Sequence, residues 1–374
     1  NIETHDLIKN NIRLSPIYNG KIDSKGPRYC PSIEDKVVRF SDKASHLIFL
    51  EPEERDGNII YPNGISTSLP KKIQRKFIKT IKGLENVEIE KFGYAIEYYS
   101  LDGSEILKTY ETKKIKGLYL SGQINGTTGY EEAAAQGLLA GINATLSIQN
   151  KKPFVLDRSE AYLGVLTDDL TVGGLNEPYR MFTSRAEYRI TLRADNADSR
   201  LTDYAIDLGL ACENRKNIWQ KKKDLISKTT IELQQIKTSP QQIKKSGVKI
   251  NLDGKKRSAY EVLGYNLSSW DNIQKIWPHL RNINISETLK SQIKTNAFYS
   301  KYVNRQNLEI KSLKNDFDLE FKDNLDYNQC AGISNEIKEI LRKKKPKNFG
   351  EAKRLPGMTP AAAALLLRHL KKTG

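Results

Sequence analysis

Features that would place a protein in several common classes are scarce or missing in this chain of 374 residues. It has three cysteines, Cys30, Cys212 and Cys330, which lie far apart and form no CxxC pair. This spacing argues against a disulfide scaffold or a zinc site, and the four histidines form no motif, so no metal is predicted. No apolar run approaches the roughly 18 residues of a membrane span, and no signal peptide is visible. We therefore expect a cytoplasmic protein without membrane contacts.

Positive charge is the strongest bias of the composition. Lysine and arginine outnumber aspartate and glutamate by 61 to 45, which gives a net charge of +16. Such an excess suits a polyanionic partner such as RNA. A biased composition would also produce it, because many lysines stand beside asparagines and isoleucines. The basic clusters at residues 113–116, 221–223, 255–257 and 342–345 are each interpreted as solvated surface, although dispersed phosphate contacts add up through counterion release.

The order of elements predicts an α/β region followed by a mainly helical part. Residues 37–40, 46–50 and 94–98 have the composition of strands, and residues 73–84 carry apolar residues at helical spacing. From Asp203 onward, long stretches rich in lysine, glutamine, glutamate and isoleucine indicate helices, for example over residues 217–236. A last helix is expected over residues 361–370, with Thr359 as its N-cap and Pro360 in its first turn.

Residues 118–144 form the most informative segment. A short apolar run leads into a turn with three glycines, and a helix of very small residues follows. Glycine allows tight turns and a close approach of the backbone to a ligand. We expect Thr127 or Thr128 to cap the helix, whose N-terminus suits an anion or an electron-rich ring. The plain alternative is an ordinary strand–turn–helix of an α/β core.

Three segments carry recognisable motifs, GPRYCPSIEDKV from residue 26, GQINGTTGYEEAAAQG from residue 122 and EPYRMFTSRAEYR from residue 177. They resemble the family of the tRNA uridine 5-carboxymethylaminomethyl modification enzyme MnmG, also called GidA. The resemblance covers nearly the whole chain, most closely up to about Leu201 and again from Tyr327. It implies an α/β FAD-binding fold, Rossmann-like and of the glutathione-reductase type, followed by a mainly α-helical C-terminal domain. The family's G-x-G-x-x-G turn does not occur here, so we interpret the chain as the C-terminal part of a longer enzyme.

The same resemblance implies how the chain is divided. Residues 1–150 would be the C-terminal part of the FAD/NAD-binding region, and residues 151–202 an arginine-rich connecting segment. Residues 203–374 would form a helical domain for tRNA and partner binding.

An activity is implied as well. It is the addition of an aminomethyl or carboxymethylaminomethyl group to carbon 5 of the wobble uridine of tRNA. The implied cofactors are FAD and NADH, with methylenetetrahydrofolate as the one-carbon donor. The implied partners are tRNA, a second copy of the chain in a homodimer, and the GTPase MnmE in a heterotetramer.

Two other functions stay open on the sequence. The first is a folate- and FAD-dependent tRNA (uracil-5-)-methyltransferase, a shorter relative of the same class, although the long basic helical half argues against it. The second is a non-catalytic module that binds RNA or protein. A flavin spectrum in the purified protein would exclude the second.

The stretch from Gly26 to Phe40 combines a turn, cations and a thiol. Arg28 stands close to Cys30, and a nearby cation favours the thiolate. A loop with an inert cysteine is the plain alternative. The resemblance implies a catalytic role for Cys30 and contact with the pyridine nucleotide for the whole stretch. The predicted nucleotide-binding residues are Gly26, Pro27, Arg28, Tyr29, Cys30, Pro31, Ser32, Ile33, Glu34, Asp35, Lys36, Val37, Val38, Arg39 and Phe40.

The glycine turn is the second predicted site. The resemblance implies that Gln123 contacts FAD and that the backbone after it lies near the isoalloxazine ring. A glutamine amide offers both a donor and an acceptor, and a helix N-terminus stabilises negative charge on a reduced flavin. A solvent-facing turn residue is the plain alternative. The predicted flavin-binding residues are Gln123, Asn125, Gly126, Thr127, Thr128 and Gly129.

Residues 177–200 are dense in arginine, with aromatic residues between. Arginine contacts phosphates bidentately, and aromatic faces stack on unpaired bases. The acids Glu177, Glu187, Asp195 and Asp198 could instead pair with the arginines in a structural network. We expect both kinds of arginine. The resemblance implies an RNA-facing surface here, for which Arg180, Arg185 and Arg189 are the predicted residues.

Overall fold

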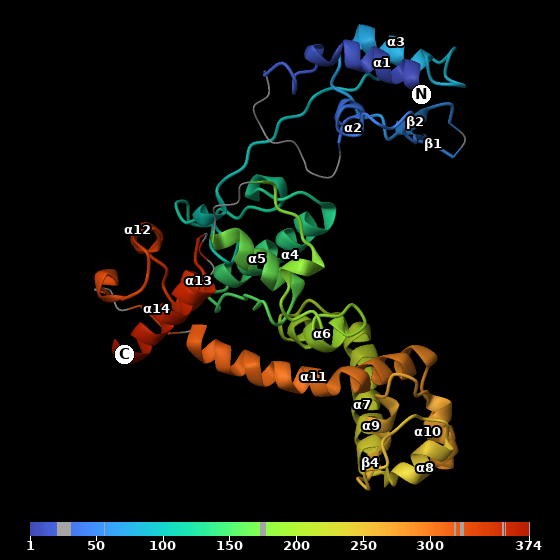
Figure 1. The fold of residues 1–374 in the computed structure, drawn as a ribbon, viewed down its shortest axis with the longest axis vertical. Coiled ribbons are helices and arrows are strands. Elements are labelled where there is room, and N and C mark those ends of the chain that lie inside the picture. Colours follow the sequence, from blue (N-terminus) through green and yellow to red (C-terminus); the bar gives the residue numbers. More distant parts are fainter. Residues whose placement is uncertain are drawn as a thin grey trace. The chain divides into compact units, whose positions relative to one another are not determined.

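The computed structural model describes residues 1–20, 31–55, 57–172, 177–317, 319–321, 325–353, 355 and 357–373. The chain forms two compact units, and Figure 1 labels their elements. The first unit consists of Asn1–Pro153 and Gly173–Arg180, and the second of Phe154–Val172 and Met181–Gly374. No helix among the described residues is long and apolar enough to cross a membrane.

The first unit opens with three helices and a hairpin around one core. The helices are α1 (Ile2–Asn10), α2 (Ile33–Arg39) and α3 (Lys71–Lys79). Strands β1 (Phe49–Pro52) and β2 (Ile60–Asn63) pair antiparallel, with Phe49 opposite Asn63. The core consists of Ile8, Ile33, Val37, Ile65, Leu69, Ile73 and Phe77. His46 joins it to α1, because its Nδ1 lies 3.0 Å from Nε2 of His5.

Between α3 and α4, the longest helix of the first unit, the described chain forms 3-10 turns and isolated bridges but no α-helix or sheet. Isolated bridges pair Ile106 with Thr112 and Glu111 with Tyr119, so the apolar run before the glycine turn is bridged and not a full strand. A 3-10 turn covers Gly122–Asn125, and helix α4 runs over Tyr130–Ile148. The small side chains of α4 agree with the predicted helix.

The second unit is mainly helical, as predicted from the sequence. It contains α5 (Tyr162–Val172), α6 (Ala197–Asp207), α7 (Glu213–Gln235), α8 (Pro240–Lys245), α9 (Ala259–Leu263), α10 (Trp270–Ile276) and α11 (Glu287–Phe317), the long orange helix of Figure 1. Two short strands, β3 (Lys237–Thr238) and β4 (Arg257–Ser258), pair antiparallel. Capping boxes start α9 and α10, where Ser258 pairs with Glu261 and Ser269 with Asn272.

Three helices close the chain around a separate core. They are α12 (Asn335–Lys344), α13 (Phe349–Lys353) and α14 (Pro360–Thr373). The core includes Cys330, Leu341, Phe349 and Leu366. The predicted cap of the last helix is confirmed, because the Ala362 N–H donates to Thr359 Oγ1 at 3.2 Å.

Three predicted strands need correction. Residues 37–39 are helical, because Ser32 caps α2 by accepting from the Asp35 N–H and Glu34 and Asp35 stand in its first turn. Residues 94–98 form no strand, because they have no ladder partner among the described residues and a strand exists only by pairing. Of residues 46–50, only Phe49 and Leu50 enter a strand.

Truncation in the core between α7 and α11 should be costly. Leu263 is fully buried there, so Leu263→Ala is expected to lower the free energy of unfolding by about 3 kcal/mol. Trp270 and Trp277 pack against this core, and their fluorescence in a urea titration reports its unfolding. Leu267 is 70% exposed, so Leu267→Ala is the control and should change stability by less than about 0.5 kcal/mol. Equal midpoints for the two variants would contradict this assignment of the core.

Candidate functional site

The glycine turn before α4 has a backbone that other residues would strain. Gly126 has φ 77°, in the left-handed region, and Gly129 has φ 126°. A Cβ built on Gly126 would meet no atom within 4 Å, so the space beside this residue is open. Gln123 is exposed on the same turn. The turn therefore presents backbone and one amide side chain to its surroundings.

A buried amide holds this turn in place from within α4. Gln136 is fully buried, and its Oε1 accepts from the Gly122 N–H at 3.1 Å and from Asn125 Nδ2 at 2.8 Å. Its Nε2 donates to Thr127 Oγ1 at 2.9 Å, and that hydroxyl donates to the Gly122 carbonyl at 3.0 Å. One side chain thus fixes three residues of the turn.

The threonines of the turn do not cap α4, contrary to the prediction. The N-cap is Gly129, which has no side chain to accept a bond. Thr127 is engaged by Gln136, and the Thr128 N–H donates to the Tyr179 carbonyl at 2.8 Å. Tyr179 returns a bond of 2.8 Å from its own N–H to the Gly126 carbonyl. The segment at Tyr179 therefore holds the turn from a second side.

One buried polar atom of the turn lacks a hydrogen bond within the described part of the chain. It is Asn125 Oδ1, while Asn125 Nδ2 donates both to Gln136 and to the Leu120 carbonyl at 2.9 Å. A buried acceptor without a donor costs about 1–3 kcal/mol. A ligand that carries an N–H group would satisfy this atom.

The predicted nucleotide-binding stretch from Gly26 to Phe40 is described only from Pro31 onward. Gly26, Pro27, Arg28, Tyr29 and Cys30 lie outside the described residues. Among residues 32–40, several polar side chains anchor α2 to the segment after β2. Glu34 is fully buried and accepts from Thr67 Oγ1 at 2.9 Å and from the Ser68 N–H at 3.0 Å. Lys36 Nζ donates to the Gly64 carbonyl at 2.8 Å.

Other residues of this stretch face solvent or a tyrosine. Val38, Arg39 and Phe40 are exposed. Asp35 accepts from the Tyr18 hydroxyl at 2.8 Å, and burial together with this bond raises the pKa of Tyr18 to about 12. Within the described part of the chain, no hydrogen bond joins the Ser32–Phe40 stretch to the Gln123–Gly129 turn. Among the described residues of the predicted nucleotide-binding stretch, Val38, Arg39 and Phe40 are therefore accessible to a ligand.

The arginine-rich segment is held by a cation that the sequence analysis missed. Arg158 contacts Asp168 at 3.3 Å, Glu187 at 3.0 Å and also Asp169, and its Nη2 donates to the Arg185 carbonyl at 3.0 Å. Burial alone would lower its pKa, but Asp169 and Glu187 outweigh burial and raise it. No local pattern signals this residue, because its partners lie 10 to 29 positions away.

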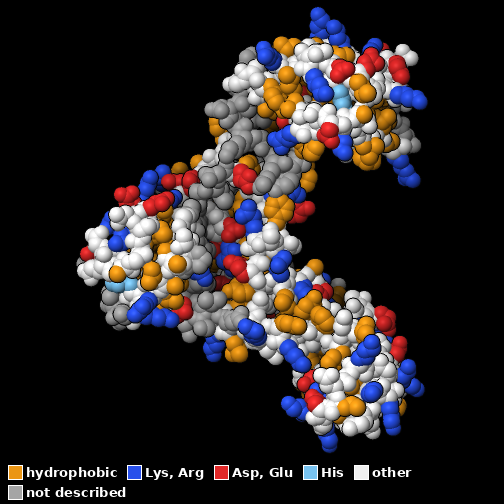
Figure 2. Space-filling view, viewed as in Figure 1, with side chains coloured by type: hydrophobic (Ala, Val, Ile, Leu, Met, Phe, Trp, Pro, Cys, Tyr) orange, Lys and Arg blue, Asp and Glu red, His pale blue; other side chains and the backbone are white. Residues whose placement is uncertain are grey.

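The arginines of the segment differ in their surroundings, and those that bind within the second unit agree with the structural role expected for some of them. Arg193 pairs with Asp195 at 2.8 Å and donates to Asn296 at 2.5 Å. Arg200 donates to the Arg193 carbonyl at 3.1 Å and to the Glu160 carbonyl, and burial lowers its pKa. Arg189 is exposed and forms no ion pair with a described residue. Arg180 and Arg185 are half-buried. Figure 2 shows blue Lys and Arg side chains spread over one face, with red acids among them.

Comparison with known proteins identifies the family. Residues 1–152 match the family model "Glucose inhibited division protein A". Residues 213–307 match the "tRNA modifying enzyme MnmG/GidA C-terminal helical domain", and residues 309–374 match the C-terminal helical bundle of the same enzyme. The chain belongs to the MnmG/GidA family.

Individual relatives agree with this assignment. A curated tRNA uridine 5-carboxymethylaminomethyl modification enzyme MnmG from Buchnera aphidicola is 47% identical over 383 residues, which cover 100% of this chain and 60% of the relative. Two crystal forms of Aquifex aeolicus GidA match with TM-scores of 0.76 and 0.75 at 40% and 39% identity. Each match covers 99% of this chain. It covers 58% of the GidA chain in crystal form I and 57% in crystal form II. The chain thus spans about 60% of the length of the curated relative.

These matches confirm the predicted fold class. The N-terminal part belongs to the FAD-binding GidA region, and a mainly α-helical part follows it. Within the described residues, the first unit has only the β1–β2 pair as a sheet. Two features of the turn are compatible with a flavin edge. The open side of Gly126 leaves room for a ring, and Asn125 Oδ1 has no hydrogen-bond donor among the described residues.

Replacing the buried amide of Gln136 should loosen the turn. Gln136→Leu keeps the size of the side chain but leaves the buried Gly122 N–H without its acceptor, at a cost of about 1–3 kcal/mol. Hydrogen exchange at Gly122 should speed up, and the melting temperature should fall. Gln149→Leu, at the exposed C-terminal end of the same helix, is the matched control and should alter neither. Wild-type exchange at Gly122 in Gln136→Leu would show that the amide does not hold the turn.

Removing the Arg158 charge should destabilise the second unit. Arg158→Met keeps an unbranched chain but takes a cation from three carboxylates, which is expected to cost about 3 kcal/mol. Arg158→Lys keeps a positive charge and should lose less stability than Arg158→Met. Urea titrations at pH 7 measure it. Arg215→Met, at an exposed site on α7, is the control. Equal losses in Arg158→Met and Arg158→Lys would mean that Arg158 does not act through its charge alone.

Proposed function

We propose that this chain is part of an FAD-dependent tRNA modification enzyme. With the GTPase MnmE, it adds an aminomethyl or carboxymethylaminomethyl group to carbon 5 of the wobble uridine. The observation that carries the proposal is the glycine turn, with its open Gly126 and its buried Asn125 oxygen, in a chain 47% identical to a curated MnmG.

The turn supplies the flavin contacts in this proposal. FAD, when bound, supplies the redox and one-carbon chemistry of the reaction. Asn125 Oδ1 accepts from the ring edge, exposed Gln123 offers a donor and an acceptor, and Gly126 leaves the backbone uncovered. Thr127, Thr128 and Gly129 shape the turn. Gln136 positions Asn125 and Thr127 without reaching the ligand.

The stretch from Gly26 to Phe40 binds NADH in this proposal. Exposed Arg39 offers a cation for a phosphate, and exposed Val38 and Phe40 offer apolar contacts for a ring. Cys30 is the catalytic thiol. The one-carbon donor is methylenetetrahydrofolate.

RNA binding in this proposal involves exposed Arg189 and the half-buried Arg180 and Arg185. The helical part, residues 203–374, docks tRNA and MnmE. The enzyme acts in the cytoplasm as a homodimer within a heterotetramer.

The helical half also separates this proposal from its alternatives. Residues 213–374 match models of the MnmG/GidA helical domains almost throughout, which favours the carboxymethylaminomethyl enzyme over the shorter methyltransferase. A non-catalytic binding module has no need of an open glycine turn with an unpartnered acceptor.

Analysis of tRNA nucleosides tests the proposal. Cells that lack the gene for this chain should lose the 5-substituted wobble uridine from their tRNA, as measured by liquid chromatography and mass spectrometry. Wild-type protein should restore it, and Cys30→Ser should not, because a hydroxyl is a poor substitute for a thiolate. Cys212→Ser is the matched control, because Cys212 is exposed and distant in sequence, and it should restore the nucleoside fully.

Two outcomes would count against it. An unchanged nucleoside profile in the cells without the gene would reject the whole proposal. Full restoration by Cys30→Ser would reject only the catalytic role of the cysteine.

A further inference from the structure

Helix α3 in the first unit carries an unusual concentration of positive charge. Its nine residues include Lys71, Lys72, Arg75, Lys76 and Lys79, and all five side chains are exposed. At 100° per residue they fall within an arc of about 140°. No acidic residue occurs from residue 71 to residue 84. The exposed face of α3 is therefore uniformly cationic.

The opposite face of α3 is buried in the core of the unit. Ile73 and Phe77 belong to the core cluster with Ile8 of α1, and Gln74 is 2% exposed. A membrane-surface helix needs a free apolar face beside its cations. Helix α3 has no such face, so it cannot insert into a bilayer as an amphipathic helix.

No described acidic side chain neutralises these cations. None of the five forms an ion pair with another described residue. Two of them lie over an aromatic ring, with Lys71 Nζ 5.6 Å and the Arg75 guanidinium 4.9 Å from the centroid of Phe92. Such contacts order long side chains but leave their charge available.

The position of Phe92 is itself fixed by a buried clamp. Gln74 Nε2 donates to the Gly93 carbonyl at 2.8 Å, and Gln74 Oε1 accepts from the Gly93 N–H at 2.9 Å. Gln74 also donates to the Leu69 carbonyl at 2.6 Å. The segment that carries the ring is thus tied to α3, which lowers the entropy cost of ordering the cations on binding.

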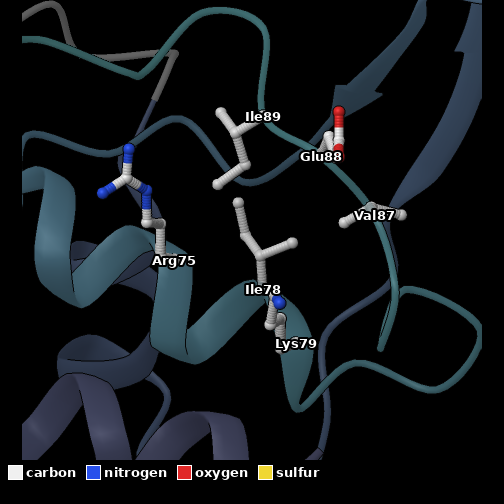
Figure 3. A pocket seen from close by; sticks show the side chains of 6 residues that line it. All are labelled: Arg75, Ile78, Lys79, Val87, Glu88 and Ile89. Carbon is white, nitrogen blue, oxygen red and sulfur yellow. The ribbon is translucent and has the colours of Figure 1, made fainter.

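A groove runs beside the cationic face. It has a volume of about 320 Å³ and is lined by Arg75, Ile78, Lys79, Val87, Glu88 and Ile89. Figure 3 shows Ile78 and Ile89 pointing toward one another, with Arg75 and Lys79 on α3. The groove thus places the apolar side chains of Ile78, Val87 and Ile89 beside two cations and the Glu88 carboxylate. Apolar side chains next to cations suit an unpaired base whose phosphates contact the helix.

We propose that α3, together with Phe92, is an additional RNA-binding surface, which contacts the phosphate backbone of the tRNA. It differs from the arginine-rich segment, from which it is more than 90 residues away in sequence. The proposal rests on the proposed function, since it takes tRNA as the polyanion.

Salt-dependent binding of tRNA by the full chain tests this surface. Lys72 and Lys76 contact neither Phe92 nor the groove, so Lys72→Gln with Lys76→Gln should leave the fold intact. Each lost phosphate contact removes about 0.7–0.9 from the slope of log affinity against log salt. The double variant should therefore flatten the slope by about 1.5 and weaken binding on the order of tenfold at 50 mM salt.

Two further variants sharpen the test. Lys151→Gln with Lys152→Gln removes the same charge from exposed positions of the same unit, and its slope and affinity should match the wild type. Phe92→Leu keeps an apolar side chain but frees Lys71 and Arg75. It should weaken binding several-fold with little change of slope.

The outcomes separate this inference from the proposed function. If wild-type protein binds tRNA and the α3 variant matches the Lys151/Lys152 control in slope and affinity, the α3 surface is rejected while the proposed function stands. If the wild type binds no tRNA, both are rejected. A flattened slope in the α3 variant alone supports the surface.

Discussion

The site depends above all on the buried amide of Gln136. A turn with glycines in left-handed conformations is costly to order, because glycine has the most backbone freedom to lose. Gln136 offsets this cost through bonds to Gly122, Asn125 and Thr127, each worth about 1 kcal/mol net. Removing it would cost more than the bonds are worth, since buried donors would lose their partners. The amide can therefore hold a backbone open to a ligand while remaining out of reach itself.

Burial decides what each cation of this chain does. The side chain of Arg158 is 13% exposed and lies among three carboxylates. These ion pairs neutralise its charge and join α5 to the segment at Glu187. Arg193 and Arg200 are engaged in the same way by acids, amides and carbonyls. The cations of α3 are exposed and have no acidic partner among the described residues. Net charge alone does not distinguish these groups, but their surroundings do.

Local signals in the sequence predicted much of this structure. The glycine turn, the small-residue helix α4 and the Thr359 cap follow from residue types at short spacing. The strand predicted at residues 37–40 was wrong because a cap at Ser32 outweighed β propensity. The roles of Gln136 and Arg158 could not be predicted, since their partners lie 9 to 29 residues away and only folding brings them together. Residues that hold a site are thus harder to find than residues that line it.

Hydrogen exchange at the turn, with and without flavin, tests the central claim most directly. The enzyme would be compared as isolated with FAD and after removal of FAD, with peptides resolved by mass spectrometry. Exchange in the peptide that spans Gly122 to Gly129 should slow when FAD is bound, because the ring would cover Gly126 and pair with Asn125 Oδ1. Peptides from α9 and α10 should not change. Equal exchange at the turn in both samples, with FAD demonstrably bound in one, would contradict the account.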